Sequence, residues 1–336
     1  MVPVLVGPWA RFRFRFRFRG CPIVAVLPES HHEWTAVRQS VAGRVRQYGA
    51  EWGAGMTGGV ELVVIGANGG PERSYGGSAL AADGAGLLAE ALPGALFDTG
   101  SHGCRATLVP PDADANAMLT ALREAARQQG RCLVVCLLGQ LVADPRGRRL
   151  ALVTAGSTPD NAYRRGLAWD WVVSTMVHGA QDEVLLLVDA VAAPETWAAI
   201  GGLDGEQGVA ELLAHSRVPL WGRVGPYPSG RRSRGAVLPG GEGSFSWALG
   251  RVLERGVPGA PATIGPAELQ PAVAAELAWG ELASGIEARV LVPPSGGRLL
   301  MRNRAAVRGA LAGLSVSEEL LAVLWRESAP TDPPSA

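Results

Sequence analysis

The sequence contains no lysine: all 31 basic residues are arginines, and 31 acidic residues balance them to a net charge of zero. Because the chain has no net positive charge, its overall electrostatics do not favour nucleic acids or anionic membranes, and we expect neither as a partner. We attribute the arginine-only usage, together with the 45 glycines and 24 prolines, to a high-GC coding sequence. The arginines are therefore not taken as evidence for phosphate recognition.

Cysteine is scarce, at four residues, and long apolar runs are lacking. No run reaches the ~18 residues that span a bilayer, so we expect no membrane segment. Cys132 and Cys136 lie four residues apart in one apolar stretch, so both point to the same face of a strand, as small core residues do. No cysteine has the spacing of a metal site, so we expect no metal, no cofactor and a reducing, cytoplasmic setting.

The first 55 residues differ in pattern from the rest of the chain. Arginine and phenylalanine alternate from Arg11 to Arg19, which is typical of an amphipathic strand or of a membrane-surface segment. The charges follow the short apolar start, whereas in a secretory signal they precede it. A simple-sequence repeat in the gene, with the true start at Met56, is the alternative. We expect residues 1–55 to be a low-complexity leader outside the fold, and residues 327–336 to be a disordered tail.

From Val60 onwards, continuous apolar stretches alternate with segments of helical period. Strands are expected at 60–67, 105–109, 132–138, 150–153, 184–188, 218–224 and 288–292. Helices are expected at 78–92, 115–129, 167–177, 209–215, 244–255, 266–279 and 315–326, and a long exposed loop at 226–243. Asp114 and a serine at 244 are placed to cap helices. This alternation predicts an α/β fold, a three-layer α-β-α sandwich around a mainly parallel sheet.

Two of the apolar strands resemble signatures of the caspase and metacaspase superfamily, the C14-type cysteine peptidases. Residues 133–140 (LVVCLLGQ) resemble the strand that runs into Ser-Gly-His-Gly, and residues 185–193 (LLLVDAVAA) the strand that runs into Asp-x-Cys-His-Ser-Gly. Weaker similarities to the family's other motifs occur, in order, at 80–88, 108–115, 147–152 and 243–249. The resemblance implies one caspase-like domain over 56–326, with a large-subunit-like part at 60–200 and a small-subunit-like part at 205–305.

The chain departs from the family where the chemistry lies. In this register Gln140 stands in place of the catalytic histidine and Val191 in place of the nucleophilic cysteine. The family's reaction needs a thiolate beside an imidazole, and neither side chain supplies one. Ala192 and Ala193 also replace a polar pair. The sequence therefore predicts a catalytically inactive, caspase-like binding or regulatory component, of a bacterial conflict or signalling system, with a protein or peptide partner.

Two carboxylates are candidate binding residues. Asp189 matches the residue with which metacaspase-type relatives bind a basic substrate side chain, although an aspartate at a strand end also caps turns. Asp160 would line the same cleft or serve as a turn residue. Two other interpretations stay open. One is an active cysteine-type endopeptidase whose catalytic residues lie elsewhere in the chain, and the other is an unrelated doubly wound enzyme for a small ligand.

The interpretation of the leader makes a prediction about stability. Deleting residues 1–55 should leave the melting temperature almost unchanged, because a segment outside the fold buries no core side chains. Thermal unfolding of the full chain and of a chain that begins at Met56 measures the difference. A decrease in the free energy of unfolding of more than about 2 kcal/mol, the size expected for removing buried side chains, would show that the leader belongs to the fold.

Overall fold

The computed structural model describes residues 13–18, 21–26, 59–67, 79–96, 103–144, 149–158, 161–201, 213, 217–227, 237–284, 288–291 and 299–306. The chain forms two compact units, Met1–Gly55 and Met56–Ala336. In the first unit, β1 (Arg13–Phe18) and β2 (Cys21–Val26) pair as an antiparallel hairpin. The alternating Arg-Phe segment therefore forms a strand, which is one of the two structures its pattern predicts.

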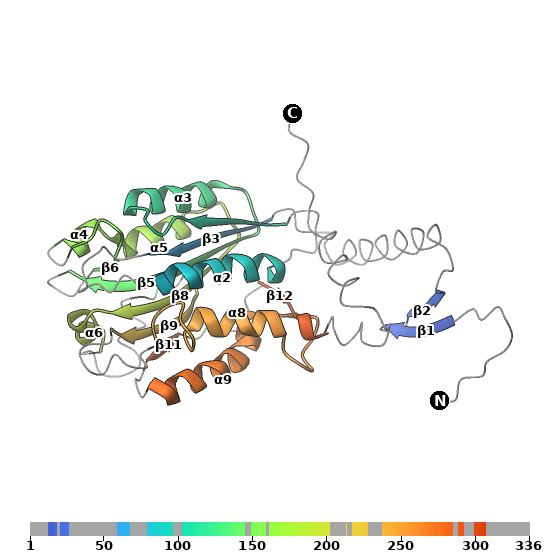
Figure 1. Ribbon diagram of the computed structural model, residues 1–336. Helices are drawn as coiled ribbons and strands as arrows, with labels where there is room; N and C mark the ends of the chain where they lie inside the picture. The colour runs from blue at the N-terminus through green and yellow to red at the C-terminus, as the bar shows by residue number, and fades with distance from the viewer. Residues whose placement is uncertain are drawn as a thin grey trace. The chain divides into compact units, whose positions relative to one another are not determined.

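The second unit is built on one large sheet, whose main path has the strand order β11-β9-β8-β5-β3-β4 (Figure 1). Five strands are parallel: β3 (Val60–Gly66), β4 (Cys104–Val109), β5 (Cys132–Ala143), β8 (Glu183–Ala192) and β9 (Leu220–Pro226). The edge strand β11 (Arg289–Leu291) runs antiparallel to β9. Two short strands, β6 (Leu150–Leu152) and β7 (Leu167–Ala168), extend the sheet from the end of β5.

Helices cover both faces of this sheet (Figure 1). On one face, α3 (Ala115–Arg127) and α5 (Trp169–Val177) share a core with Leu133 and Val135 of β5. On the other face, α2 (Ala79–Ala95), α8 (Phe245–Arg255) and α9 (Pro266–Ser284) pack on Val134 and Cys136. The predicted three-layer sandwich is confirmed, and the strands that contain Cys132 and Val184 are adjacent and central, as expected.

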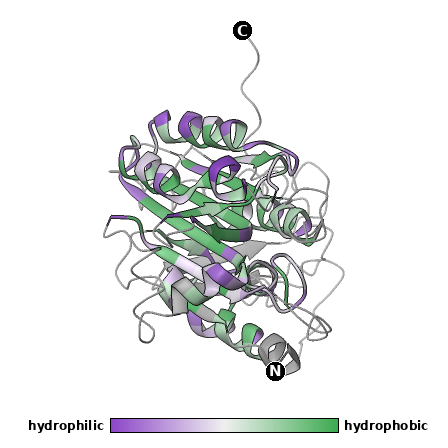
Figure 2. Cartoon of the chain, turned by 90° about the vertical axis from the view of Figure 1, so that its left-hand side faces the viewer, coloured by the Kyte–Doolittle hydropathy of each residue, from purple (hydrophilic) through white to green (hydrophobic). Residues whose placement is uncertain are grey.

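The apolar pattern explains why β5 and β8 lie at the centre. Successive side chains of a strand point to opposite faces, and in β5 every residue from Cys132 to Val142 is buried. A strand that is apolar on both faces fits only where helices cover both of them. In Figure 2 the strands are mostly hydrophobic, whereas the hydrophilic residues gather on the flanking helices.

Helix starts follow the expected caps. Asp114 accepts a hydrogen bond from the Ala117 amide at 2.8 Å, and α3 begins directly after it. Ser244 is the N-cap of α8 and accepts from the Trp247 amide at 3.3 Å. Each cap satisfies an amide that the helix itself leaves without a partner, a contribution of about 1 kcal/mol.

Three expectations differ from the structure in their limits. The strand expected at 132–138 continues to Ala143, because β8 and then β6 give its last residues backbone partners. The helix expected from 167 begins at Trp169, because Leu167 and Ala168 pair with β6 instead. The exposed loop expected over 226–243 is wrong at both ends, because β9 includes Pro226, and Pro239 and Gly243 are buried.

Several other expected elements lie outside the described residues. The helix at 315–326 is among them, and of the helix at 209–215 only Leu213 is described. Two helices were not expected at all: α6 (Pro194–Gly201) and α4 (Ala162–Arg165). A small antiparallel pair, β10 (Thr263–Ile264) with β12 (Met301–Arg302), lies apart from the main sheet.

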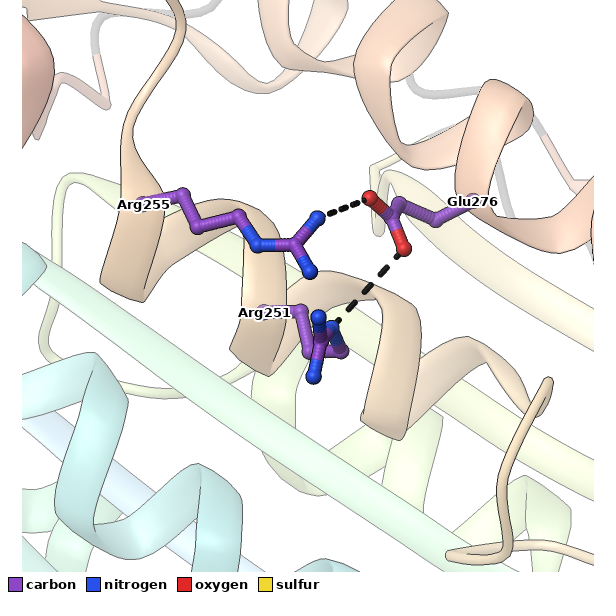
Figure 3. Close-up of polar contacts among 3 residues, drawn as sticks. All are labelled: Arg251, Arg255 and Glu276. Atoms are coloured by element: carbon purple, nitrogen blue, oxygen red, sulfur yellow. Dashed lines mark hydrogen bonds and ion pairs between the residues drawn. The ribbon is translucent and has the colours of Figure 1, made fainter.

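Polar contacts join α9 to its neighbours. Glu276 of α9 accepts from Arg255 Nη1 at 2.7 Å, and its second oxygen lies 3.9 Å from Arg251 Nε, so one carboxylate serves two arginines of α8 (Figure 3). Trp221 of β9 donates from Nε1 to Gln270 of α9 at 2.5 Å. The arginines are partly exposed, so the ion pairs contribute on the order of 1 kcal/mol or less, and the apolar contacts of α9 supply most of its docking.

The close pairing of β8 with β9 depends on a glycine in β9. Gly222 has φ +153°, and a Cβ added there would lie 1.9 Å from the Val188 carbonyl oxygen on β8. Neither backbone can move away without breaking the β8–β9 pairing. By contrast, nothing lies within 4 Å of a Cβ added at Gly86 of α2.

These two glycines should respond in opposite directions to the same substitution. We expect Gly222→Ala to lower the free energy of unfolding by at least about 3 kcal/mol, through strain and the clash with β8. Gly86→Ala should raise it by about 0.5–1 kcal/mol, because alanine has the better helix propensity. Urea unfolding of both variants measures this, and equal stabilities would contradict the described β8–β9 geometry.

Candidate functional site

The structure places the two predicted dyad positions directly opposite each other. Gln140 of β5 and Val191 of β8 are partners in the register of the two parallel strands. Both lie near the carboxyl ends of their strands, the edge at which ligands and catalytic groups gather in parallel sheets. They are 8% and 3% exposed, so both are buried. The interpretation of this pair as a degenerate catalytic dyad stays a prediction.

The side chains at this point have no acid-base or nucleophilic chemistry. Valine carries only hydrocarbon, and the glutamine amide does not exchange a proton near neutral pH. A peptidase of the expected type needs a nucleophile activated by an adjacent base. The pair Gln140 and Val191 supplies neither, although its position is suited to both.

Apolar packing fills the surroundings of the pair. Val142, Val153 and Ala193 form a small buried cluster with two alanines, Ala151 and Ala162. The Val153 amide donates to the Gln140 carbonyl oxygen at 2.9 Å, so β5 is fixed at this residue. At the last residue of β5, the Ala143 amide donates to Thr196 Oγ1 of α6 at 2.7 Å. Among the described residues, the ends of β5 and β8 therefore form packed core.

Asp189, the predicted peptide-binding residue, is 2% exposed and faces α8. Its Oδ2 accepts hydrogen bonds from the Ser246 amide at 2.9 Å, from Ser246 Oγ at 2.5 Å and from the Gly240 amide at 3.3 Å. Ser246 lies in the first turn of α8, where free amides and the helix dipole favour a negative charge. Asp189 therefore anchors this helix to the central strand.

The second oxygen of the same carboxylate is different. Oδ1 of Asp189 is buried and has no hydrogen-bond partner among the residues that the structure describes. Leaving a buried acceptor unsatisfied costs about 1–3 kcal/mol, and more for a charged group. The described residues therefore satisfy one oxygen of this carboxylate and leave the other oxygen without a hydrogen bond.

Arg223 is a site residue that the sequence analysis missed. It lies on β9 as the register partner of Asp189 and is 2% exposed. Buried arginine is rare, and when it occurs it marks an ion pair or a functional site. The available signal was a single arginine inside the otherwise uncharged strand 220–226. Asp160, the other predicted binding residue, lies outside the described residues.

The thiols of the described strands are not activated. Burial, with a contribution from Glu61, raises the pKa of Cys104 to about 12, and burial with Glu183 raises the pKa of Cys132 to about 12. Burial raises the pKa of Cys136 even further. A reactive cysteine needs the opposite shift, because the thiolate is the nucleophile. All three are free cysteines; Cys132 and Cys136 are buried core residues, as predicted for the pair in β5, while Cys104 is partly buried.

No described thiol is hydrogen-bonded to an imidazole. Within the described ranges the one histidine is His178, which caps the end of α5 and lies 2.8 Å from the Ser174 carbonyl oxygen through Nδ1. It precedes β8, so it belongs to the amino-terminal edge of the sheet. The remaining four histidines lie outside the described residues: His31, His32, His102 and His215.

Neither a metal site nor a membrane-spanning helix is found among the described residues. Its acidic residues, histidines and cysteines form no group of three or more that could hold a metal ion. None of its helices is both long enough and apolar enough to cross a bilayer.

The raised pKa values predict how the thiols react. At pH 8 a thiol with a pKa near 12 is ionised in about one molecule in ten thousand, against roughly a quarter for a free cysteine. Iodoacetamide should therefore leave Cys104, Cys132 and Cys136 unmodified in the folded protein and modify all three in urea. Peptide mapping by mass spectrometry distinguishes them. Stoichiometric modification of any one in the folded state would identify an activated thiol.

The Asp189 contacts predict a specific loss of stability. Asp189→Asn keeps the shape of the side chain but removes the charge that the amide and hydroxyl of Ser246 stabilise. We expect a loss of about 2–3 kcal/mol in urea unfolding. The matched control is Asp112→Asn, at an exposed position, which should change stability by less than about 0.5 kcal/mol. Equal effects of the two substitutions would mean that Asp189 does not anchor α8.

Comparison with known proteins adds a remote structural likeness. No family model matches the chain, and no curated protein matches it in sequence. Among solved structures, the chain is similar to caspase-1 from Spodoptera frugiperda, with 15% identity and a TM-score of 0.39. The match covers 70% of this chain and 84% of that one. A likeness this remote assigns neither a family nor an activity.

Proposed function

We propose that this protein is a catalytically inactive, caspase-like component that acts by binding a protein or peptide partner. The observation that carries the proposal is the pairing of Gln140 with Val191. The arrangement keeps the two adjacent strand ends that a dyad requires, and its side chains can neither attack a carbonyl group nor transfer a proton. The raised pKa values of the three thiols in the described strands support the same conclusion.

The binding role is assigned to the carboxyl edge of the sheet. Oδ1 of Asp189 is the atom that a basic side chain of a peptide would contact, and Asp160 belongs to the same proposed surface. Because Asp189 is 2% exposed, such a contact requires the segment 237–244 to move away from it. A regulatory role in a bacterial conflict or signalling system, in the cytoplasm, completes the proposal. The free thiols fit a reducing compartment.

The alternative is an active cysteine endopeptidase. Since the raised pKa values of Cys104, Cys132 and Cys136 disfavour their thiolates, its nucleophile would have to be Cys21, whose side chain lies outside the described residues. This alternative makes a distinct prediction, because alkylation of a single accessible cysteine would then abolish activity.

Cleavage assays test the proposal. The purified protein should cleave neither Arg/Lys nor Asp reporter peptides, and iodoacetamide should make no difference. Gln140→His alone should also be inactive, because base and nucleophile act as a unit. Cleavage by the unmodified protein that is lost when one cysteine is alkylated would overturn the proposal and establish the peptidase.

A further inference from the structure

The segment that leads into α8, residues 237–244, contacts the buried carboxylate of Asp189. Its Gly240 amide donates a hydrogen bond to Asp189 Oδ2 at 3.3 Å. The segment contains no helix or strand, yet Pro239 and Gly243 are buried. Contacts with other parts of the chain, and not regular secondary structure, therefore hold it against Asp189.

A contact between two glycine backbones seats this segment on α2. A Cβ added at Gly240 would lie 1.7 Å from the Leu80 carbonyl oxygen and 2.9 Å from the Gly84 amide nitrogen. From the other side, a Cβ added at Gly84 would lie 2.3 Å from the Gly240 Cα. Because real Cβ atoms do not approach so closely, the segment can contact both α2 and Asp189 only while positions 84 and 240 are glycines.

Gly243 separates two groups of hydrogen bonds to Asp189. It has φ +78° and directly precedes Ser244, the N-cap of α8. On the helix side, Ser246 donates to Asp189 Oδ2 from its amide at 2.9 Å and from Oγ at 2.5 Å. On the other side lies the longer bond from Gly240. Rotation of the backbone at Gly243 would therefore release Gly240 and leave both bonds of Ser246 in place.

The backbone hydrogen bonds of the segment show what such a rotation breaks. The Gly241 amide donates to the Leu238 carbonyl oxygen at 3.0 Å, within the segment, so this turn can move as a unit. The Ser244 amide donates to the Gly241 carbonyl oxygen at 3.0 Å, across Gly243, so this bond is lost together with that of Gly240. Release thus leaves the sheet and α8 intact and requires less free energy than unfolding.

We propose that residues 237–244 form an autoinhibitory latch on the carboxyl edge of the sheet. In the closed state, which the structure shows, Gly240 is bonded to Asp189. In the open state the segment has rotated at Gly243, while Ser246 keeps α8 docked. A basic group reaches Asp189 only in the open state, so binding and closure compete. The identity of this ligand rests on the proposed function, whereas the opening itself does not.

Hydrogen exchange of two amides measures the opening without any ligand. Opening breaks the bond of the Ser244 amide and keeps that of the Ser246 amide. After correction for intrinsic rates, we expect Ser244 to exchange at least about tenfold faster than Ser246. Equal protection of the two amides would show that the segment and the helix are released together, and would overturn the latch.

Alanine at Gly240 should open the latch, because its Cβ meets the backbone of α2. The matched control is Gly259→Ala. Gly259 has a similar φ, +77° against +81°, but nothing lies within 4 Å of a Cβ added there. The two substitutions share the backbone strain and differ in the clash. We expect Gly240→Ala to lower the protection of the Ser244 amide about tenfold, and Gly259→Ala to leave it unchanged.

The same contact can be tested from α2, which keeps the experiment decisive if Gly240→Ala fails to fold. A Cβ at Gly84 has the Gly240 Cα as its closest neighbour, whereas a Cβ at Gly86 has no neighbour within 4 Å. Gly84→Ala should lower the protection of Ser244 more than that of Ser246, and Gly86→Ala should change neither. Unchanged Ser244 protection in Gly240→Ala and in Gly84→Ala would overturn the proposal.

A titration with a capped Ala-Arg-Ala tripeptide connects the latch to binding. The peptide should bind Gly240→Ala about tenfold more tightly than the unmodified protein, because a larger fraction of the molecules is open. Gly259→Ala should bind like the unmodified protein, and adding Asp189→Asn to Gly240→Ala should abolish the gain. Equal affinities of Gly240→Ala and the unmodified protein would overturn the latch. Faster exchange of Ser244 without peptide binding by any variant would support the opening and overturn the ligand assigned by the proposed function.

Discussion

The architecture of the carboxyl edge depends on the buried carboxylate of Asp189. It belongs to the central strand β8, and one of its oxygens accepts three hydrogen bonds from the first turn of α8 and from the segment that leads into it. In a low-dielectric interior such charge-assisted bonds are strong, and a free charge would be costly. Helix α8, which donates hydrogen bonds to Asp189, shares a hydrophobic core with α2 and α9. The position of the helices on one face of the sheet therefore depends on this residue.

This anchoring has a consequence for chemistry. A carboxylate at the end of a central parallel strand is well placed to bind a ligand, but here the fold itself uses one of its oxygens. Beside it, Gln140 and Val191 are register partners without a nucleophile or a base, and the nearby residues Val142, Val153 and Ala193 belong to a buried apolar cluster. The ends of these two strands are therefore buried core, which illustrates why function must be argued from side chains and not from the fold.

Much of the scaffold was predictable because it is encoded locally. The continuous apolar stretches that became β3, β5 and β8 can be buried only between two helical layers, and Asp114 and Ser244 mark helix starts by their capping chemistry. The motif resemblance marked the positions Gln140 and Val191, whereas the register that sets them opposite each other came from the structure, since apolar periodicity alone does not align two strands.

The rest depends on contacts between residues far apart in the chain. Asp189 and Ser246 are 57 positions apart, and nothing near either residue indicates that they meet. The burial of Pro239, within a segment rich in glycine and arginine, likewise follows from tertiary packing and not from local composition; the adjacent Gly240 lies against Leu80 of α2. Arg223 was overlooked because one arginine in a strand is ambiguous until its neighbour across the sheet is known.

The central claim is that the strand end at position 191 is packed core and not an open cleft. The most direct measurement is the rate at which a neutral maleimide labels a cysteine placed there by Val191→Cys, followed by peptide mapping. Leu108→Cys, at a position that is 50% exposed on the edge strand β4, is the matched reference. The described packing predicts labelling at 191 at least about 100-fold slower than at 108, on the order of the rarity of local opening in a stable core. Comparable rates at the two positions would show that the end of β8 is accessible, and would contradict the account.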